Sequence, residues 1–159
     1  MAQKPSPELY HRLRDQALVT TADMLGMHPD GDRSILVLLT EMDMGTSVTV
    51  VTMADGTTSF YLGYGGGAIG GGKHESIRAC CARALAIAET LLPSFQPVEA
   101  CPPAAPGQVI FYARTFDGMK AYVCRQDEIL QSNHPFGPLF GAAQDVLTGF
   151  RLLDPERQQ

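Results

Sequence analysis

The chain has 159 residues, of which 45% are apolar and 18% are charged, and this balance excludes a disordered chain. Its length predicts a single domain covering residues 1–159. The formal net charge is −5 and the basic residues are scattered, so we expect no nucleic-acid partner. There is no membrane-length apolar run and no secretory signal, so we expect a cytoplasmic protein with no membrane contact.

The first predicted element is a helix that begins after Ser6. Ser6 suits the N-cap position and Pro7 suits the first helical position. Apolar residues then recur near helical spacing as far as Leu25, and Gly26 is the expected stop. The pattern therefore predicts one helix between Ser6 and Gly26.

Three strands are predicted next, as an antiparallel meander. Residues 33–43 are apolar on both faces of a strand, with Ile35, Val37 and Leu39 pointing the same way. Two further β-rich runs flank Asp55-Gly56, and this dipeptide is typical of a tight hairpin. These strands need cover on both faces of their sheet.

The second half of the chain predicts a helix, a hairpin and a helix. Residues 74–92 have a helical apolar face, and Pro93 ends that helix. The proline-rich residues 93–107 are predicted to be a crossover without an element of its own. A hairpin around Asp117-Gly118 follows, and a last helix spans 138–153.

The predicted order is α-β-β-β-α-β-β-α, which gives an α+β fold with a five-stranded antiparallel sheet and helices on both faces. This order resembles the profilin-like folds and, among them, the roadblock family. The roadblock family places two strands before its middle helix, whereas three are predicted here. The resemblance therefore implies an architecture and carries no function.

The most unusual stretch is the loop 63–76, in which seven of the first ten residues are glycine. It connects a strand to a helix, where unpaired N–H groups gather and the helix dipole is positive. A phosphate or carboxylate could bind the amides of Gly71, Gly72 and Lys73, with Gly72 as the N-cap and Glu75 reaching back to it. The candidate ligand- or partner-binding residues are Gly65, Gly66, Gly67, Gly70, Gly71, Gly72, Lys73 and His74.

The same loop comes close to a nucleotide-binding P-loop pattern. Gly67, Gly72 and Lys73 match that pattern, but His74 replaces the Ser or Thr that would hold magnesium. The preceding strand also belongs to an antiparallel hairpin, so we do not predict nucleotide hydrolysis. A structural use of the glycines, in a tight loop or beside another backbone, stays open.

Few other residues suggest chemistry. His74 is the candidate catalytic base, but it needs a second polar group to fix its tautomer. The four cysteines have no zinc-type spacing, and we expect reduced, mostly buried thiols. We predict no metal and no cofactor.

The strings "GGGAIGGGKH", "APGQVIFYARTFDG" and "HPFGPLFGAAQDVLTGFRLL" resemble a group of small bacterial proteins with a GGGxxGGGxH loop. The resemblance implies a bacterial, cytoplasmic setting and brings no activity with it. Three functions stay open: a binding or interaction module that uses the loop 63–76, an enzyme or small-ligand protein with an anion site at Gly71–Lys73 and His74, and a roadblock-like homodimer that partners a switch protein.

Overall fold

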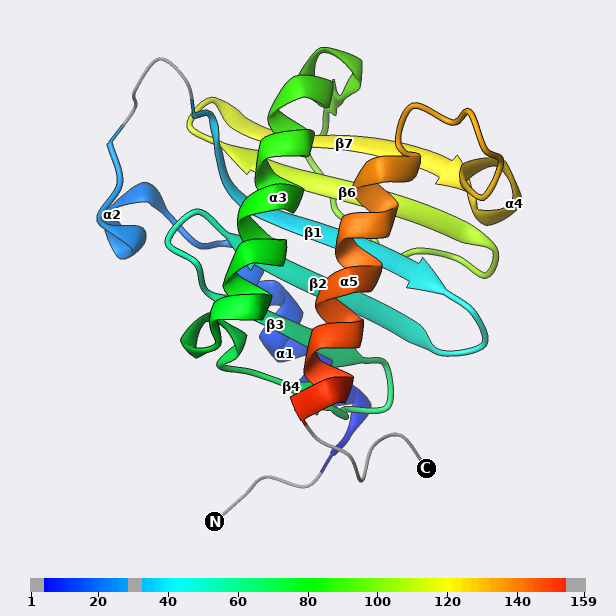
Figure 1. Ribbon diagram of the computed structural model, residues 1–159, viewed down its shortest axis with the longest axis horizontal. Coiled ribbons are helices and arrows are strands. Elements are labelled where there is room, and N and C mark those ends of the chain that lie inside the picture. The colour runs from blue at the N-terminus through cyan, green and yellow to red at the C-terminus, as the bar shows by residue number, and fades with distance from the viewer. Residues whose placement is uncertain (1–4, 29–32, 154–159) are drawn as a thin grey trace.

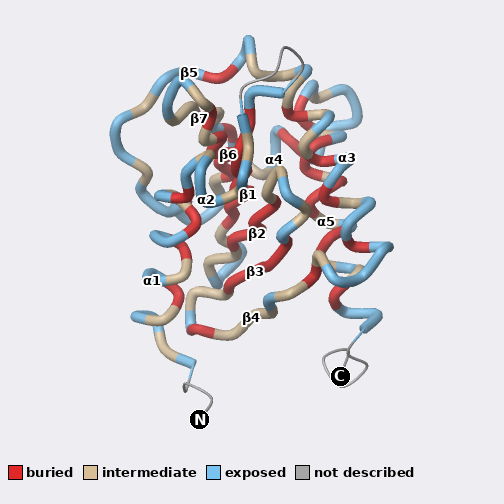
Figure 2. The backbone as a smooth tube through the Cα atoms, turned by 90° about the vertical axis from the view of Figure 1, so that its left-hand side faces the viewer, coloured by how far each residue is buried: buried red, intermediate tan, exposed pale blue. Residues whose placement is uncertain are grey.

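The computed structural model describes residues 5–28 and 33–153, which form three layers. A twisted sheet lies in the middle, with α3 (Glu75–Leu91) and α5 (Gly137–Leu153) on one face and α1 (Pro7–Leu18) on the other (Figures 1 and 2). Two shorter helices are α2 (Ala22–Leu25) and α4 (Gln126–Ile129). The α+β fold with helices on both faces is confirmed.

The described residues form a sheet of seven antiparallel strands in the order β4-β3-β2-β1-β6-β7-β5. The prediction of five strands is wrong because two edge strands are only two residues long and have no readable periodicity. The strands are β1 (Ile35–Asp43), β2 (Ser47–Met53), β3 (Thr58–Leu62), β4 (Gly67–Ala68), β5 (Gln96–Pro97), β6 (Gln108–Thr115) and β7 (Gly118–Arg125).

Both predicted hairpins are confirmed. Asp55-Gly56 lies in the turn between β2 and β3, and Phe116-Asp117 forms the turn between β6 and β7, which begins at Gly118. The last helix begins one residue before the predicted start and ends at the predicted Leu153. Among the described residues, no helix has both the length and the apolarity to cross a membrane.

The single N-terminal helix was a wrong prediction. Ser6 does cap α1, because its hydroxyl accepts the amide of Leu9, but α1 ends at Leu18. Thr21 then caps the separate helix α2 by accepting the amide of Met24. A threonine in this position gives the backbone an alternative to a continuous helix.

A bulge at the start of β1 corrects the predicted strand faces. Ile35 pairs with Thr115 and Val37 with Arg114, so Leu36 is the additional residue. Ile35 consequently packs with Leu38 beneath α3 and α5, not with Val37 on the other face. One inserted residue reverses which face a side chain meets.

The face of the sheet that carries α1 contains a buried ion pair. The Arg14 guanidinium donates to both carboxylate oxygens of Glu41, at 2.6 and 2.8 Å, and to the carbonyl of Cys101 at 2.7 Å. The hydroxyl of Thr49 donates to the same carboxylate at 2.7 Å. Burial alone would lower the pKa of Arg14, but the hydrogen bonds and charge of Glu41 outweigh burial and raise it. The pair thus ties α1, β1 and the 98–106 segment together.

Candidate functional site

The glycines of the loop 63–76 lie where other segments approach the backbone closely. A Cβ added at Gly71 would lie 2.5 Å from Cζ of Phe150 and 3.0 Å from the carbonyl oxygen of Thr58. A Cβ at Gly72 would lie 2.5 Å from the carbonyl oxygen of Gly56. Contact distances this short leave no room for a side chain. Packing therefore accounts for two of the candidate binding glycines.

Two earlier glycines of the loop need both space and an unusual backbone. Gly65 has φ +103° and would place a Cβ against the backbone of Ser6. Gly67 has φ +138° and would place one against the carbonyl of Phe60. Side chains disfavour this left-handed region, and glycine does not. The loop is thus a wall packed between the start of α1 and the sheet edge.

The amides expected to bind an anion are partly used by the loop itself. The Lys73 amide donates to the Gly70 carbonyl at 3.2 Å, and the His74 amide donates to the Gly71 carbonyl at 3.0 Å. The helical N-cap is His74, so the predicted cap at Gly72 is wrong. Residues 71–73 instead form a 3-10 turn, whose internal hydrogen bonds use these donors. An anion at Lys73 or His74 would have to displace these bonds.

The side chains of Lys73 and His74 are exposed at the start of α3. In the described part of the chain, the His74 imidazole has no hydrogen-bond partner. Of the two remaining candidate glycines, Gly66 would place a Cβ 2.6 Å from the ring of Tyr64, and Gly70 has φ +80° with open space around an added Cβ. A catalytic histidine normally has a second group that fixes its tautomer. The fold therefore does not bring a catalytic pair together at His74.

Arg78 connects this loop to its surroundings. Its Nε and Nη2 donate to the Gly72 carbonyl at 3.0 and 2.6 Å. The same side chain runs 3.5 Å from where a Cβ of Gly56 would lie, beside the β2–β3 turn. No sequence pattern indicates this role of Arg78, because its separation of six residues from Gly72 is not a recognisable motif.

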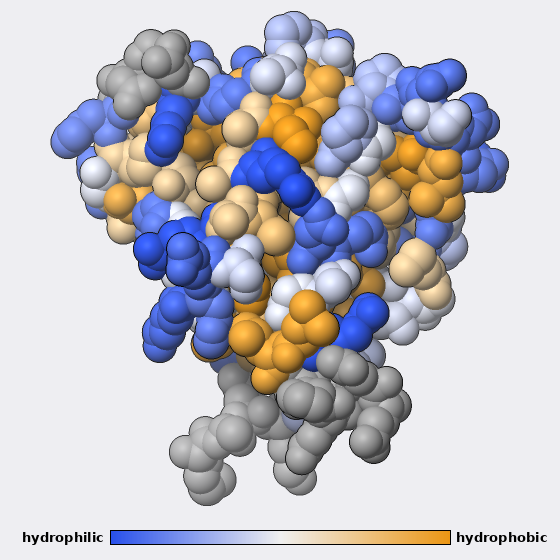
Figure 3. Space-filling view, viewed as in Figure 1, coloured by the Kyte–Doolittle hydropathy of each residue, from blue (hydrophilic) through white to orange (hydrophobic). Residues whose placement is uncertain are grey.

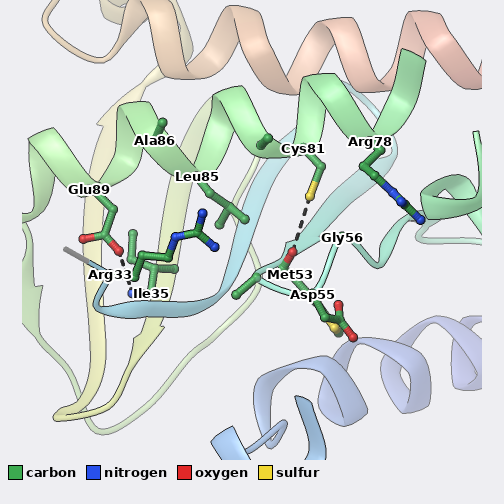
Figure 4. A pocket seen from close by; sticks show the side chains of 12 residues that line it. Arg33, Ile35, Met53, Asp55, Gly56, Arg78, Cys81, Leu85, Ala86 and Glu89 are labelled. Carbon is green, nitrogen blue, oxygen red and sulfur yellow. Dashed lines mark hydrogen bonds between the residues drawn. The ribbon is translucent and has the colours of Figure 1, made fainter. Parts of the chain in front are cut away.

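A cavity of about 480 Å³ opens next to Arg78, between α3 and the sheet (Figure 4). Two arginines and two carboxylates line it together with apolar side chains and the turn at Gly56. This mixture of a mainly apolar wall and a few polar groups is typical of small-molecule sites. The lining residues are Arg33, Ile35, Met53, Ala54, Asp55, Gly56, Arg78, Cys81, Ala82, Leu85, Ala86 and Glu89.

Both carboxylates of the cavity already bind backbone amides. One oxygen of Glu89 accepts the amides of Ser34 and Ile35 at 2.6 and 2.8 Å, which fixes the start of β1 against α3. Asp55 accepts the amide of Thr57 at 2.9 Å, and in Figure 4 its carboxylate points away from α3. The bonds of Glu89 thus join two walls of the cavity.

The cysteine that lines the cavity, Cys81, is buried and of low reactivity. The Cys81 thiol lies in the cavity wall and donates to the Met53 carbonyl at 3.4 Å, and its burial raises its pKa. All four cysteines are free, as expected, and Cys80 and Cys101 are half-buried rather than buried. A raised thiol pKa lowers the fraction of the reactive thiolate.

We predict slow alkylation of Cys124. Burial, followed by the charge of Glu128, raises the pKa of its thiol to about 11. At pH 8 the native thiol should react about 100-fold more slowly than the same thiol in urea, because its thiolate is rarer. Mass spectrometry of labelled peptides over time measures both rates. Equal rates in the two states would contradict the burial of this residue.

The remaining histidine of interest has a structural role. The Nδ1 of His134 accepts the amide of Phe136 at 3.0 Å, and the Phe136 ring stacks on Tyr122 with centroids 3.6 Å apart. His134 thus lies in a turn before α5 that the buried Phe136 anchors. Within the described residues, no group of three or more His, Cys, Asp or Glu side chains could hold a metal ion.

The site is thus a cavity beneath α3, and Arg78 in its lining binds the glycine loop through the Gly72 carbonyl. Comparison with protein-family models, curated protein sequences and solved structures found no match, so the resemblances to a bacterial group and to roadblock proteins stay predictions.

Proposed function

We propose that the protein is a small-molecule binding module whose site is the cavity between α3, the start of β1 and the β2–β3 turn. The observation that carries the proposal is the cavity itself, about 480 Å³ in volume, with an apolar wall and two arginines. Its size lies in the usual range for ligand sites. In this proposal the glycine loop does not touch the ligand and supports the cavity only by holding the side chain of Arg78.

A binding function is better supported than an enzymatic one. Among the described residues, His74 is not part of the cavity lining, and the thiol of Cys81 points at a backbone carbonyl. A nucleophile or base needs a partner group within hydrogen-bond reach of the reacting atom. The cavity offers guanidinium donors and apolar surface, which bind and orient a ligand.

Replacing Ala86 with leucine should abolish binding in the cavity. Ala86 is an exposed residue of α3 at the cavity wall, so a larger side chain would fill the space without disturbing the core. Ala79→Leu is the matched control, because Ala79 is also exposed on α3 but does not line the cavity. Ligand-observed NMR with a library of neutral, cationic and anionic fragments measures binding.

We expect fragments that bind the native protein and Ala79→Leu and do not bind Ala86→Leu. Two results would sink the proposal: a native protein that binds no fragment, or an Ala86→Leu variant that retains the same fragments with the same affinity. Circular dichroism of both variants checks that the helix is unchanged.

A second candidate function, protein docking, is supported by apolar side chains on the loop. Tyr64 is 57% exposed and Ile69 is 72% exposed. Apolar side chains also gather at the lower ends of α3 and α5 in Figure 3. Exposed apolar groups of this kind favour a protein partner, including a second copy of the chain. Docking there would not depend on the cavity, so Ala86→Leu would leave it unchanged.

A further inference from the structure

The charges around the cavity are not equally available to a ligand. One oxygen of Glu89 accepts the amides of Ser34 and Ile35, and one oxygen of Asp55 accepts the amide of Thr57. Neither Arg33 nor Arg78 forms an ion pair with a carboxylate of the described residues. Backbone amides thus hold one oxygen of each carboxylate in place, whereas the guanidinium of Arg33 has no carboxylate partner among the described residues.

The two arginines reach the cavity from opposite ends. In Figure 4 the side chain of Arg33 extends along the wall, with its guanidinium toward Leu85 and the middle of the cavity. Arg78 lies at the other end, next to Gly56. Two of the N–H donor groups of Arg78 are used on the Gly72 carbonyl, which leaves Nη1 for another acceptor. A guanidinium with free N–H groups is well suited to a planar or tetrahedral oxyanion.

Between these two charges the wall is apolar. Ile35 and Leu85 face each other from β1 and α3, and Met53 closes the floor beside the neutral thiol of Cys81. Transferring an apolar surface out of contact with water is favourable, so an apolar part of a ligand that displaces water from this wall would gain free energy of binding. The space between the arginines thus favours the apolar part of a ligand, and a guanidinium with free N–H groups favours its anionic oxygens.

We propose that the ligand of this cavity is an amphipathic anion, a compact apolar body with one carboxylate or phosphate group held by Arg33. The apolar body lies between Leu85 and Ile35. Arg78 borders the other end of the apolar body, and its hydrogen bonds to the Gly72 carbonyl connect the occupied cavity to the glycine loop. This inference rests on the proposed binding function and adds the chemical class of the ligand.

The test compares octanoate, octyl phosphate, octanol and octylammonium by calorimetry, below the concentrations at which they form micelles. The four probes share one apolar chain and differ in the head group. At least one of the anions should bind about tenfold more tightly than octanol, and octylammonium should be the weakest. The better of octanoate and octyl phosphate identifies which oxyanion the site prefers.

Arg33→Gln should weaken binding of the preferred anion about tenfold and leave octanol unchanged, because only the anion uses the guanidinium. Arg83→Gln is the matched control. Like Arg33→Gln, it removes one positive charge, but from a position on α3 outside the cavity, where Arg83 pairs with Asp145. The control should bind like the native protein. This difference separates a local contact from the general effect of net charge.

Three results would overturn the inference. If octanol binds as tightly as the anions, or octylammonium binds best, the cavity is a binding site but its ligand is not an anion. If Arg83→Gln weakens binding of the anion as much as Arg33→Gln does, the preference of the protein for anions comes from its net charge. If no fragment of any charge and none of the four probes bind, the proposed function itself fails.

Discussion

Replacing Arg14 with methionine should lower the free energy of unfolding by about 3–5 kcal/mol. Arg14 is 3% exposed and Glu41 is 1% exposed, so the substitution would leave a carboxylate buried without its counter-charge. The bonds of Arg14 to Glu41 and to the Cys101 carbonyl would be lost together. Urea denaturation at pH 7, followed by circular dichroism, measures the change.

The double variant Arg14→Met/Glu41→Met distinguishes the loss of the ion pair from the cost of leaving one buried charge without its partner. Removing both charges replaces an ion pair by apolar groups, which costs far less than removing one partner. We therefore expect the double variant to be more stable than Arg14→Met alone. A loss below about 1 kcal/mol for Arg14→Met would mean that the carboxylate of Glu41 is hydrated or protonated in the variant. The conclusion that this ion pair is buried away from water and holds α1 to the sheet would then be wrong.

Replacing Gly72 with alanine should lower the free energy of unfolding by about 2–3 kcal/mol. The added methyl group would meet the Gly56 carbonyl, which is backbone in a tight turn and not the movable end of a side chain. To relieve this clash, the loop would have to move away from the β2–β3 turn. The same separation would move Arg78, which holds the Gly72 carbonyl, and would therefore alter one end of the cavity.

Gly141→Ala is the control for this prediction. Gly141 lies inside α5, and an added Cβ would meet nothing within 4 Å. Alanine should stabilise this position by about 0.5–1 kcal/mol, because it favours the helix more than glycine does. Thermal or urea unfolding measures the free energy of unfolding of both variants. If the loop glycines are required for packing, it falls in Gly72→Ala and rises in Gly141→Ala. A neutral Gly72→Ala variant would show that packing does not require glycine at this position, and would restore the hypothesis that the loop 63–76 is a binding loop.

The local parts of the fold could be predicted from the sequence. The Asp55-Gly56 and Asp117-Gly118 turns, the Ser6 cap and the two-sided apolar β1 each depend on neighbouring residues, so a short window contains the necessary information. The bulge at Leu36 could not be predicted in this way, since it depends on how β1 pairs with β6, more than 70 residues later. Edge strands β4 and β5 are too short for any periodic pattern.

The site was predictable only in part. The glycine count correctly marked the loop as unusual, but the reason for glycine at positions 71 and 72 is the approach of Phe150 and Gly56 from distant segments. The cavity brings together Arg33, Leu85 and Met53, which share no spacing in the chain. Their juxtaposition is a product of the sheet order, and single-sequence patterns do not contain it.

The most direct test of the central claim, that ligands bind in the cavity and not at the loop amides, is amide-resolved NMR during separate titrations with octanoate and inorganic phosphate. The account predicts saturable shifts at Ile35, Cys81 and Leu85 with octanoate, and none with phosphate alone, because phosphate lacks the apolar body that the cavity holds. Saturable shifts confined to Gly71–His74, already produced by phosphate, would contradict the account and make the loop an anion site.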